Sequence, residues 1–167
     1  SVLGIVEEVI DGVLCLESLA SINVLDTGDG LVMLDAGGPF DIDHIYDSVR
    51  SWRPAASMRA AVFSHHHIDH VLGAARFDSE AVERGWQRPA VYGHAAMPGH
   101  FERYERTLGW NSAINQRQFG LPVEGFRWPD NWRYPDVIYH DRLTFTMGKL
   151  TFELHHARGE TDDATWT

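Results

Sequence analysis

Histidine and aspartate side chains are concentrated in residues 64–70, Ser-His-His-His-Ile-Asp-His. Read as His-x-His-x-Asp-His, this segment offers four spaced metal donors: His65, His67, Asp69 and His70. Imidazole nitrogens and carboxylate oxygens are ordinary zinc ligands, and manganese and iron(II) accept the same mixture. In an extended stretch the first three donors point to one side, and a helical turn at His70 would bring the fourth toward them. The spacing therefore predicts a metal site, with zinc as the first expectation.

Apolar segments flank this cluster and indicate how it is held. Residues 58–63 are expected to form a short buried strand, and residues 71–77 the start of a helix. A loop between two such elements can present ligands from a rigid scaffold. A solvated histidine-rich loop is the alternative, because such tracts occur as tags or weak metal binders. The internal position and the apolar flanks favour the metal site.

The stretch from residue 64 to residue 73 resembles the signature of the metallo-β-lactamase superfamily. The resemblance implies two divalent metal ions, with zinc expected first and manganese or iron(II) as alternatives. His65 and His67 would bind the first ion. Asp69 and His70 would bind the second, and Asp69 would also orient the attacking hydroxide as the catalytic residue.

A second group of possible ligands lies in residues 155–163, after a strand-like segment. Most of the superfamily carries the next histidine ligand in a Pro-Gly-His-Thr turn, and the matching turn here is Arg-Gly-Glu-Thr, with Glu160 in that place. The alkylsulfatase-like branch similarly carries a glutamate, and a carboxylate is also a metal donor. The resemblance favours Glu160 as the third ligand of the first metal, with His156 and Asp163 as alternatives. His66 stands at a variable position of the signature and is not expected to bind metal.

The composition is typical of a soluble globular protein and argues against several classes. The chain has 167 residues and a net charge of −10, whereas a nucleic-acid-binding surface is normally basic. No apolar run approaches the ~20 residues that a membrane span needs. The single cysteine, Cys15, excludes an internal disulfide and a cysteine-based zinc site. The compartment stays open between cytoplasm and periplasm.

Hydrophobic periodicity predicts strands and helices in alternation. The expected strands cover residues 5–16, 22–35, 58–63, 89–94, 143–147 and 150–154, and the expected helices cover residues 41–52 and 97–119. Tight turns are expected at Asp11-Gly12 and at Gly148-Lys149. The resemblance implies an α/β fold, the layered αββα sandwich, of which residues 1–167 would form the N-terminal half of a single domain.

Two polar residues are expected to end strands near the ligand loop. Asp35, in the sequence Asp-Ala-Gly-Gly, could accept a hydrogen bond from a ligand histidine and fix its tautomer. It could equally be a turn residue before glycines. His94 ends the strand at 89–94 and could face the site, although a lone histidine is more often packed or solvated.

The segment 107–120 is similar to a helix of the alkylsulfatase-like branch that borders the substrate pocket. Arg117 within it could pair bidentately with a sulfate or a carboxylate. A solvated arginine on an amphipathic helix is the alternative. The loop at 121–135 carries Trp128 and Trp132, which could cover an apolar substrate or form the underside of a long loop.

Metal-dependent hydrolysis is the expected function, because a cationic metal lowers the pKa of a bound water toward neutrality. A sulfate ester is the first substrate expected from the alkylsulfatase-like features. A lactonase or thioesterase of glyoxalase-II type is one alternative, and a non-catalytic metal-binding half-domain is another. The partner would be a small-molecule ester, and a C-terminal half, a complementing chain or a second copy would complete the site.

Overall fold

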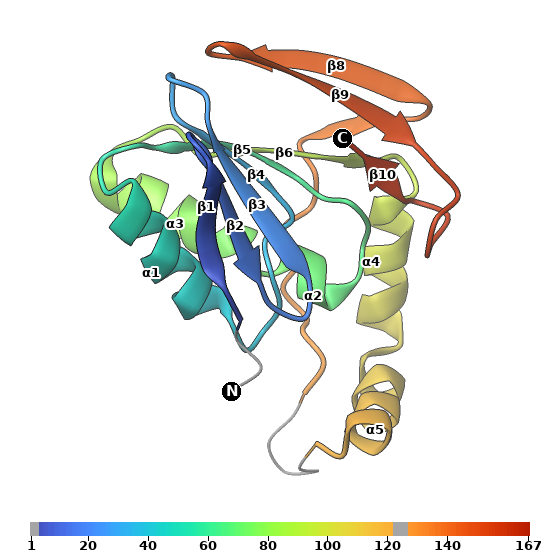
Figure 1. Ribbon diagram of the computed structural model, residues 1–167. Coiled ribbons are helices and arrows are strands. Elements are labelled where there is room, and N and C mark those ends of the chain that lie inside the picture. Colours follow the sequence, from blue (N-terminus) through green and yellow to red (C-terminus); the bar gives the residue numbers. More distant parts are fainter. Residues whose placement is uncertain (1–3, 122–126) are drawn as a thin grey trace.

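A seven-stranded mixed sheet lies at the centre of the computed structural model, which describes residues 4–121 and 127–167 (Figure 1). Its strands follow one another in chain order: β1 (Val6–Ile10), β2 (Val13–Glu17), β3 (Ser21–Asp26), β4 (Leu31–Leu34), β5 (Met58–Val62), β6 (Ala90–His94) and β7 (Val137–Tyr139). Strands β1 to β4 pair antiparallel, whereas β4 to β7 pair parallel. Parallel neighbours need long crossover connections, and these connections carry the helices and the ligand loop.

Helices form the layer on one face of this sheet. They are α1 (Ile42–Trp52), α2 (Ile68–Val71), α3 (Ala74–Arg84), α4 (Met97–Arg106) and α5 (Leu108–Phe119). Helices α1, α3 and α4 contribute buried side chains to the cluster on this face, while α5 lies beyond α4 and away from the sheet (Figure 1). None of the helices in the described part of the chain has the length and apolarity needed to cross a membrane.

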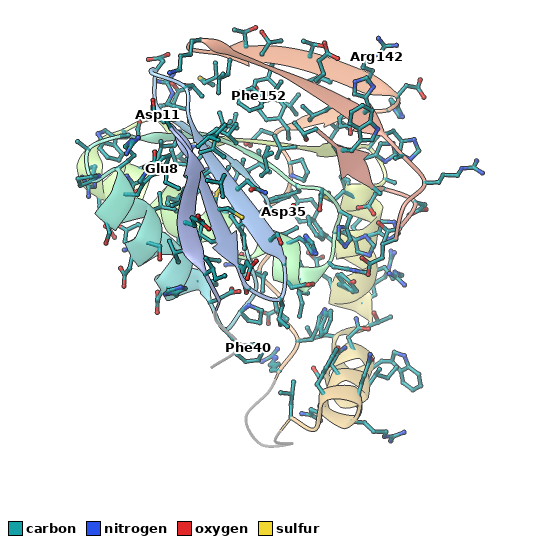
Figure 2. The ribbon with its side chains drawn as sticks, viewed as in Figure 1. Glu8, Asp11, Asp35, Phe40, Arg142 and Phe152 are labelled. Carbon is teal, nitrogen blue, oxygen red and sulfur yellow. The ribbon has the colours of Figure 1, made fainter. Side chains whose placement is uncertain are left out.

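A small antiparallel sheet covers the opposite face. It consists of β8 (Arg142–Met147), β9 (Leu150–His156) and β10 (Thr165–Trp166), in the order β10-β9-β8. Phe152 points from β9 toward the large sheet in Figure 2 and packs in one cluster with Val62 and Tyr139. The layers are therefore helices, large sheet and small sheet, which agrees with the first three layers of the expected sandwich.

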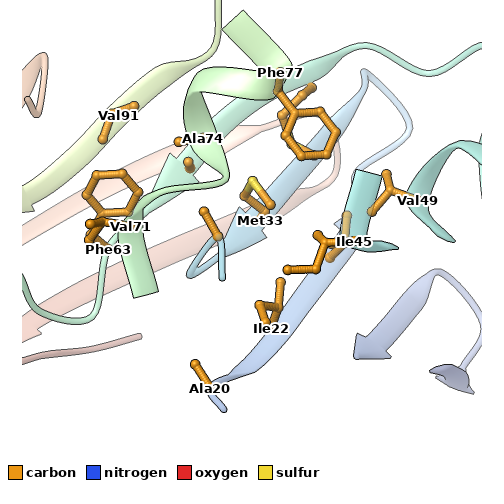
Figure 3. Packing of buried hydrophobic residues seen from close by; sticks show 14 of the residues in the cluster. Ala20, Ile22, Met33, Ile45, Val49, Phe63, Val71, Ala74, Phe77 and Val91 are labelled. Carbon is orange, nitrogen blue, oxygen red and sulfur yellow. The ribbon is translucent and has the colours of Figure 1, made fainter. Parts of the chain in front are cut away.

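Side-chain alternation on the central strands divides the core between the two faces. Leu31 and Met33 of β4 belong to the cluster beneath the helices, and Val32 belongs to the cluster beneath the small sheet. Figure 3 shows the helix-side cluster, in which Ile45 of α1 and Phe77 of α3 lie over the large sheet. Because successive side chains of a strand point to opposite faces, a strand buried on both faces reads as a continuous apolar run.

The structure confirms most expected elements and corrects three. The helix expected at 97–119 is two helices that meet at Thr107, and Gly120 ends the second one in a left-handed conformation with φ 63°. Strands β7 and β10 were not expected, because runs of three and two residues show no periodicity. Part of the loop expected at 121–135, residues 122–126, lies outside the described residues.

The segment after β4 packs closely against α2. The amide of Ala36 donates to the carbonyl of His70 at 2.6 Å, and the amide of Leu72 donates to the carbonyl of Gly37 at 3.0 Å. A Cβ atom at Gly73 would lie 2.0 Å from the carbonyl oxygen of Ala36. Glycine at this position therefore allows the backbone after β4 to reach the helix that carries the ligands.

We expect Gly73→Ala to destabilise the fold by about 1–3 kcal/mol, the usual cost of overpacking, because backbone must move to admit the methyl group. Gly99→Ala is the matched control, since a Cβ atom at Gly99 on α4 meets nothing within 4 Å and alanine is the better helix former. Urea denaturation measures both free energies of unfolding. Equal stability of the two variants would contradict the packing argument.

Candidate metal centre

Three side chains from two distant segments converge at the end of the large sheet. His65 Nε2 lies 3.0 Å from His67 Nδ1. Glu160 Oε1 lies 3.2 Å from His67 Nδ1, and Glu160 Oε2 lies 3.7 Å from His65 Nε2. Donors at about 2.1 Å from one zinc ion lie roughly 3–3.5 Å apart at coordination angles of 90–110°. The spacing and the chemistry of this donor set thus suit a divalent cation.

The hydrogen bond between His65 and Ser64 leaves a lone pair of His65 available for a metal. The hydroxyl of Ser64 donates to Asp35, so the Nδ1–H of His65 donates to Ser64 Oγ at 3.0 Å and Nε2 carries a lone pair. Burial, followed by the repulsion that protonated His70 and His67 would exert, lowers the pKa of His65 to about 4. Burial also lowers the pKa of His67. Both rings are therefore neutral at neutral pH, which is the form that binds metal.

Asp35 joins the ligand loop to the end of β4, where it lies beside α2 (Figure 2). Its Oδ1 accepts from the amide of Ser64 at 2.6 Å. Its Oδ2 accepts from the hydroxyl of Ser64 and from Nδ1 of His70, both at 2.7 Å. Asp35 is also the only non-glycine residue of the described chain with a positive φ, 59°. The sequence left open whether Asp35 contacts a ligand histidine or is only a turn residue. The structure shows the contact, with His70.

Asp69 and His70 lie next to the first three donors. Asp69 Oδ2 is 3.5 Å from His70 Nε2, and the rings of His65 and His70 are 4.1 Å apart. Burial lowers the pKa of His70, but the hydrogen bond to Asp35 and the charges of Asp35 and Asp69 outweigh it, so the pKa is raised. Among the described residues no third histidine, cysteine or acid joins Asp69 and His70 as closely as Glu160 joins the first pair.

The helical turn that redirects the chain begins earlier than the sequence suggested. His67 is the last extended residue, with φ −63° and ψ 146°, and α2 starts at Ile68. Asp69 is therefore brought to the site by the first turn of a helix and not by strand alternation. The expectation that only His70 would turn was wrong, although both side chains reach the same region.

The two alternatives to Glu160 point elsewhere. His156 stacks on His94 at 4.0 Å, and its Nε2 donates to the carbonyl oxygen of Asp162 at 2.9 Å. His94 donates from Nε2 to the carbonyl oxygen of His140, so it is a packed residue and lies in neither close donor group of the described chain. Asp163 is fully buried and accepts from His66 Nδ1 at 2.9 Å. Glu160 is thus the candidate that faces the His65–His67 pair.

A cleft of about 770 Å³ opens beside the donors. Its polar residues are His67, Asp69, Tyr104, Asn115, Gln118 and Glu160, and its apolar residues are Leu19, Pro39, Phe40, Ile68, Phe119, Leu121 and Trp128. Phe40, labelled in Figure 2, is 64% exposed, and Leu19 is 68% exposed. The sequence did not indicate these two residues, because a lone apolar side chain in a loop has no periodic signal.

Helix α5 contributes to the cleft through residues other than the one expected. Asn115 and Gln118 line the cleft, whereas Arg117 is exposed and is not among the lining residues. The structure therefore gives no support to Arg117 as a substrate-binding residue. Trp128 lines the cleft, while Trp132 is buried and stacks on Phe101 at 4.9 Å.

Comparison with known proteins identifies the family of this chain. The sequence from residue 17 to residue 165 matches the profile of the Metallo-beta-lactamase superfamily. The chain therefore belongs to this superfamily, and the α/β sandwich expected from the ligand signature is confirmed. No curated protein matches the sequence.

Several solved structures share the fold. The stereoselective inverting sec-alkylsulfatase Pisa1 from Pseudomonas sp. is similar with a TM-score of 0.71 and 20% identity, over 95% of this chain and 28% of that chain. The subclass B3 metallo-beta-lactamase BJP-1 of Bradyrhizobium japonicum has a TM-score of 0.64 and 18% identity, over 95% and 54%. A metallo-beta-lactamase of Cronobacter sakazakii has a TM-score of 0.63 and 20% identity, over 93% and 53%. This chain thus spans 28–54% of the length of these proteins.

The Asp35 contacts yield a prediction for Asp35→Asn. The amide of Ser64 can only donate, so the asparagine oxygen would face it and the NH₂ group would face His70 Nδ1. His70 would then carry its proton on Nε2. That nitrogen would have no lone pair left to bind the second metal next to Asp69. We expect about 10–100-fold weaker binding of the second metal, measured by competition with a chelator. Asp47→Asn, at an exposed position of α1, should bind as the unmodified protein does, and equal affinity of both variants would contradict the tautomer argument.

Asp163 yields a prediction for acid stability. Burial raises the pKa of this carboxyl, but the hydrogen bond from His66 and the charges of His66 and His100 outweigh it and bring the pKa to about 2, below the ordinary 3.8. His94 and Tyr104 are the other titratable groups that interact with it. Because the folded pKa is depressed, ionised Asp163 stabilises the fold above the unfolded pKa, and this contribution is lost as the pH falls from about 4 to about 2.

We therefore expect Asp163→Asn to show a shallower loss of unfolding free energy between pH 4 and pH 2, measured with urea on metal-free protein. Asp47→Asn serves as the control, because Asp47 is exposed on α1. Identical slopes for unmodified protein and Asp163→Asn would show that Asp163 does not titrate in this way.

Proposed function

We propose that this chain carries the metal-binding part of a metal-dependent hydrolase. The observation that supports the proposal is the convergence of His65, His67 and Glu160 on the wall of a cleft. Polar donors that face one another without protons between them need a cation, and the adjacent cleft offers room for a substrate. Asp69 lies in the same wall, close to His70.

The chain's own residues have separate parts in this chemistry. When bound, a divalent metal supplies the Lewis acidity that makes water a nucleophile near neutral pH. His65, His67 and Glu160 would hold the first ion, and Asp69 and His70 the second. The Asp69 carboxylate would accept a hydrogen bond from the attacking hydroxide and so orient it. Asn115 and Gln118 present amide groups that can bind the polar part of a substrate.

We propose an ester with an apolar alcohol portion as the substrate, and a sulfate ester in the first place. Leu19, Phe40 and Phe119 give the cleft an apolar wall. Pisa1, among the proteins of similar fold, is an alkylsulfatase. A lactone or a thioester is the second candidate, because its uncharged acyl group suits a cleft whose described lining holds no lysine or arginine.

We further propose that residues 1–167 form the N-terminal half of the domain and that a C-terminal half, a complementing chain or a second copy supplies the remaining ligands of the second metal. Support comes from the small sheet, where Trp166 is 58% exposed. Leu25, Leu34, Leu150 and Phe152 line a shallow apolar groove beside it. Apolar surface of this kind is typical of a contact face.

The test combines metal analysis of the full-length protein with hydrolysis of p-nitrophenyl sulfate, an alkyl sulfate and a lactone. We expect His67→Ala to lose metal and to lower kcat/KM about 100-fold or more, because metal catalysis supplies several kcal/mol. His44→Ala, at an exposed position of α1, is the control and should keep both properties. Unchanged hydrolysis in His67→Ala would exclude the mechanism. Bound metal without hydrolysis of any substrate would favour a non-catalytic metal-binding module.

A further inference from the structure

We propose that His66 and Asp163 form a positioning pair that places the Glu160 carboxylate against His65 and His67. The inference rests on the proposed metal-dependent function and adds two positioning residues to it. Neither residue belongs to the donor set itself, and the ligand signature treats the first of them as variable. Their hydrogen bond joins the two segments that carry the ligands, although the two residues are 97 positions apart in the sequence.

Few hydrogen bonds within its own loop fix the position of Glu160. Its side chain is 69% exposed. The loop that carries it is closed at its base by the amide of Ala157, which donates to the carbonyl of Ala164 at 2.8 Å. The only other backbone hydrogen bond within its described residues is a long one, from Ala164 to Thr161 at 3.4 Å. The side chain of His156 also donates to the carbonyl oxygen of Asp162 at 2.9 Å. None of these bonds involves Glu160 itself, so the position of its carboxylate depends on contacts outside the loop.

Two contacts join this loop to the ligand loop on both sides of His65. On one side, the amide of Thr165 donates to the carbonyl of Ser64 at 2.6 Å. On the other side, Nδ1 of His66 donates to Asp163 Oδ1 at 2.9 Å. Both side chains of the second contact are buried, with exposures of 3% and 0%. The residues next to a metal donor on one segment are therefore bonded to residues that follow Glu160 on the other.

Two side chains of α4 also contact the His66 ring. The ring of His100 stacks on the ring of His66 at 3.8 Å with an interplanar angle of 7°. His100 in turn contacts Asp162 through its Nε2 at 2.6 Å, and Tyr104 lies against the His66 ring at 5.4 Å. The His66 ring thus has a fixed plane and a fixed hydrogen-bond partner.

A metal site made of His66, His100 and Asp163 is the competing explanation, since their donor atoms lie close together. The ring geometry argues against it. A nitrogen lone pair lies in the plane of its imidazole ring, so two nearly parallel stacked rings direct their lone pairs along parallel planes. Such lone pairs do not meet at one point, whereas a metal needs them to converge. The stack is instead suited to fixing an orientation.

The experiment measures zinc affinity of the full-length protein by competition with a chelator, without reference to hydrolysis. We expect Asp163→Ala to weaken binding of the first zinc ion about 10–100-fold, the usual cost of removing a group that orients a metal ligand. Asp163→Asn keeps an oxygen that accepts from His66 and should recover most of the affinity. Asp47→Ala, which removes an exposed carboxylate from α1, should change the affinity less than threefold.

A double-mutant cycle with Glu160→Gln identifies the route of the effect. If the positioning pair acts through Glu160, Asp163→Ala should cost no further affinity once Glu160 is replaced. An equal loss in both backgrounds would overturn the proposal, and so would unchanged affinity in Asp163→Ala. If Asp163→Ala fails to fold, the His66→Ala/Asp163→Ala variant carries the test, because it leaves no buried partner unpaired.

Metal counting separates the remaining outcomes. A further zinc ion that the unmodified protein binds and Asp163→Ala does not, with the affinity of the first zinc ion unchanged, would make Asp163 a ligand and overturn the positioning role. Absence of bound zinc in the unmodified protein would instead contradict the proposed function itself. The two failures are therefore distinguishable in the same titration.

Discussion

The carboxylate of Asp35 is the contact on which the arrangement of the metal centre depends. It accepts three hydrogen bonds, two from Ser64 and one from His70, and so joins the end of β4 to the loop after β5 and to α2. The backbone at Asp35 adopts φ 59°, a conformation that costs a non-glycine residue of order 1–3 kcal/mol. The three hydrogen bonds and the close packing around Gly73 offset this cost. The strain lies where the side chain must be aimed, as is common at functional sites.

Some ligands of the site are close together in the sequence and one is distant, and different contacts keep them in place. Three histidines lie within the six residues 65–70 that come soon after β5: His65, His67 and His70. Because β4 and β5 pair in parallel, these histidines lie near Asp35 at the end of β4. Glu160 comes from the small sheet on the other face, and only contacts between the two ligand segments bring it near. Ligand sites at the carboxyl ends of parallel strands are the general pattern in α/β sheets. Here the second sheet adds a donor that the first sheet does not provide.

What the sequence could predict follows from the range of the interactions. The β8–β9 hairpin and the alternation of helices and strands are local patterns, and the structure confirms them. The donor spacing is also local, and His65 and His67 lie close together in the structure. The His66–Asp163 contact spans 97 positions, so no local pattern could reveal it. The direction in which Arg117 points depends on the break at Thr107, because α5 is a separate helix from α4. No residue of α5 is buried, so apolar periodicity does not show which face of the helix meets the protein. The register of a helix without an apolar face cannot be read from its sequence.

Charge links the metal centre to the substrate proposed for it. The chain carries a net charge of −10, and Asp69 and Glu160 are the charged residues in the described lining of the cleft. A sulfate ester is an anion, so this cleft would repel it unless bound cations reverse the local sign. The burial that keeps His65 neutral, with a pKa of about 4, also keeps its nitrogen available to those cations. The same desolvation that makes a charged histidine costly therefore prepares the cleft to receive metal, and through the metal an anion.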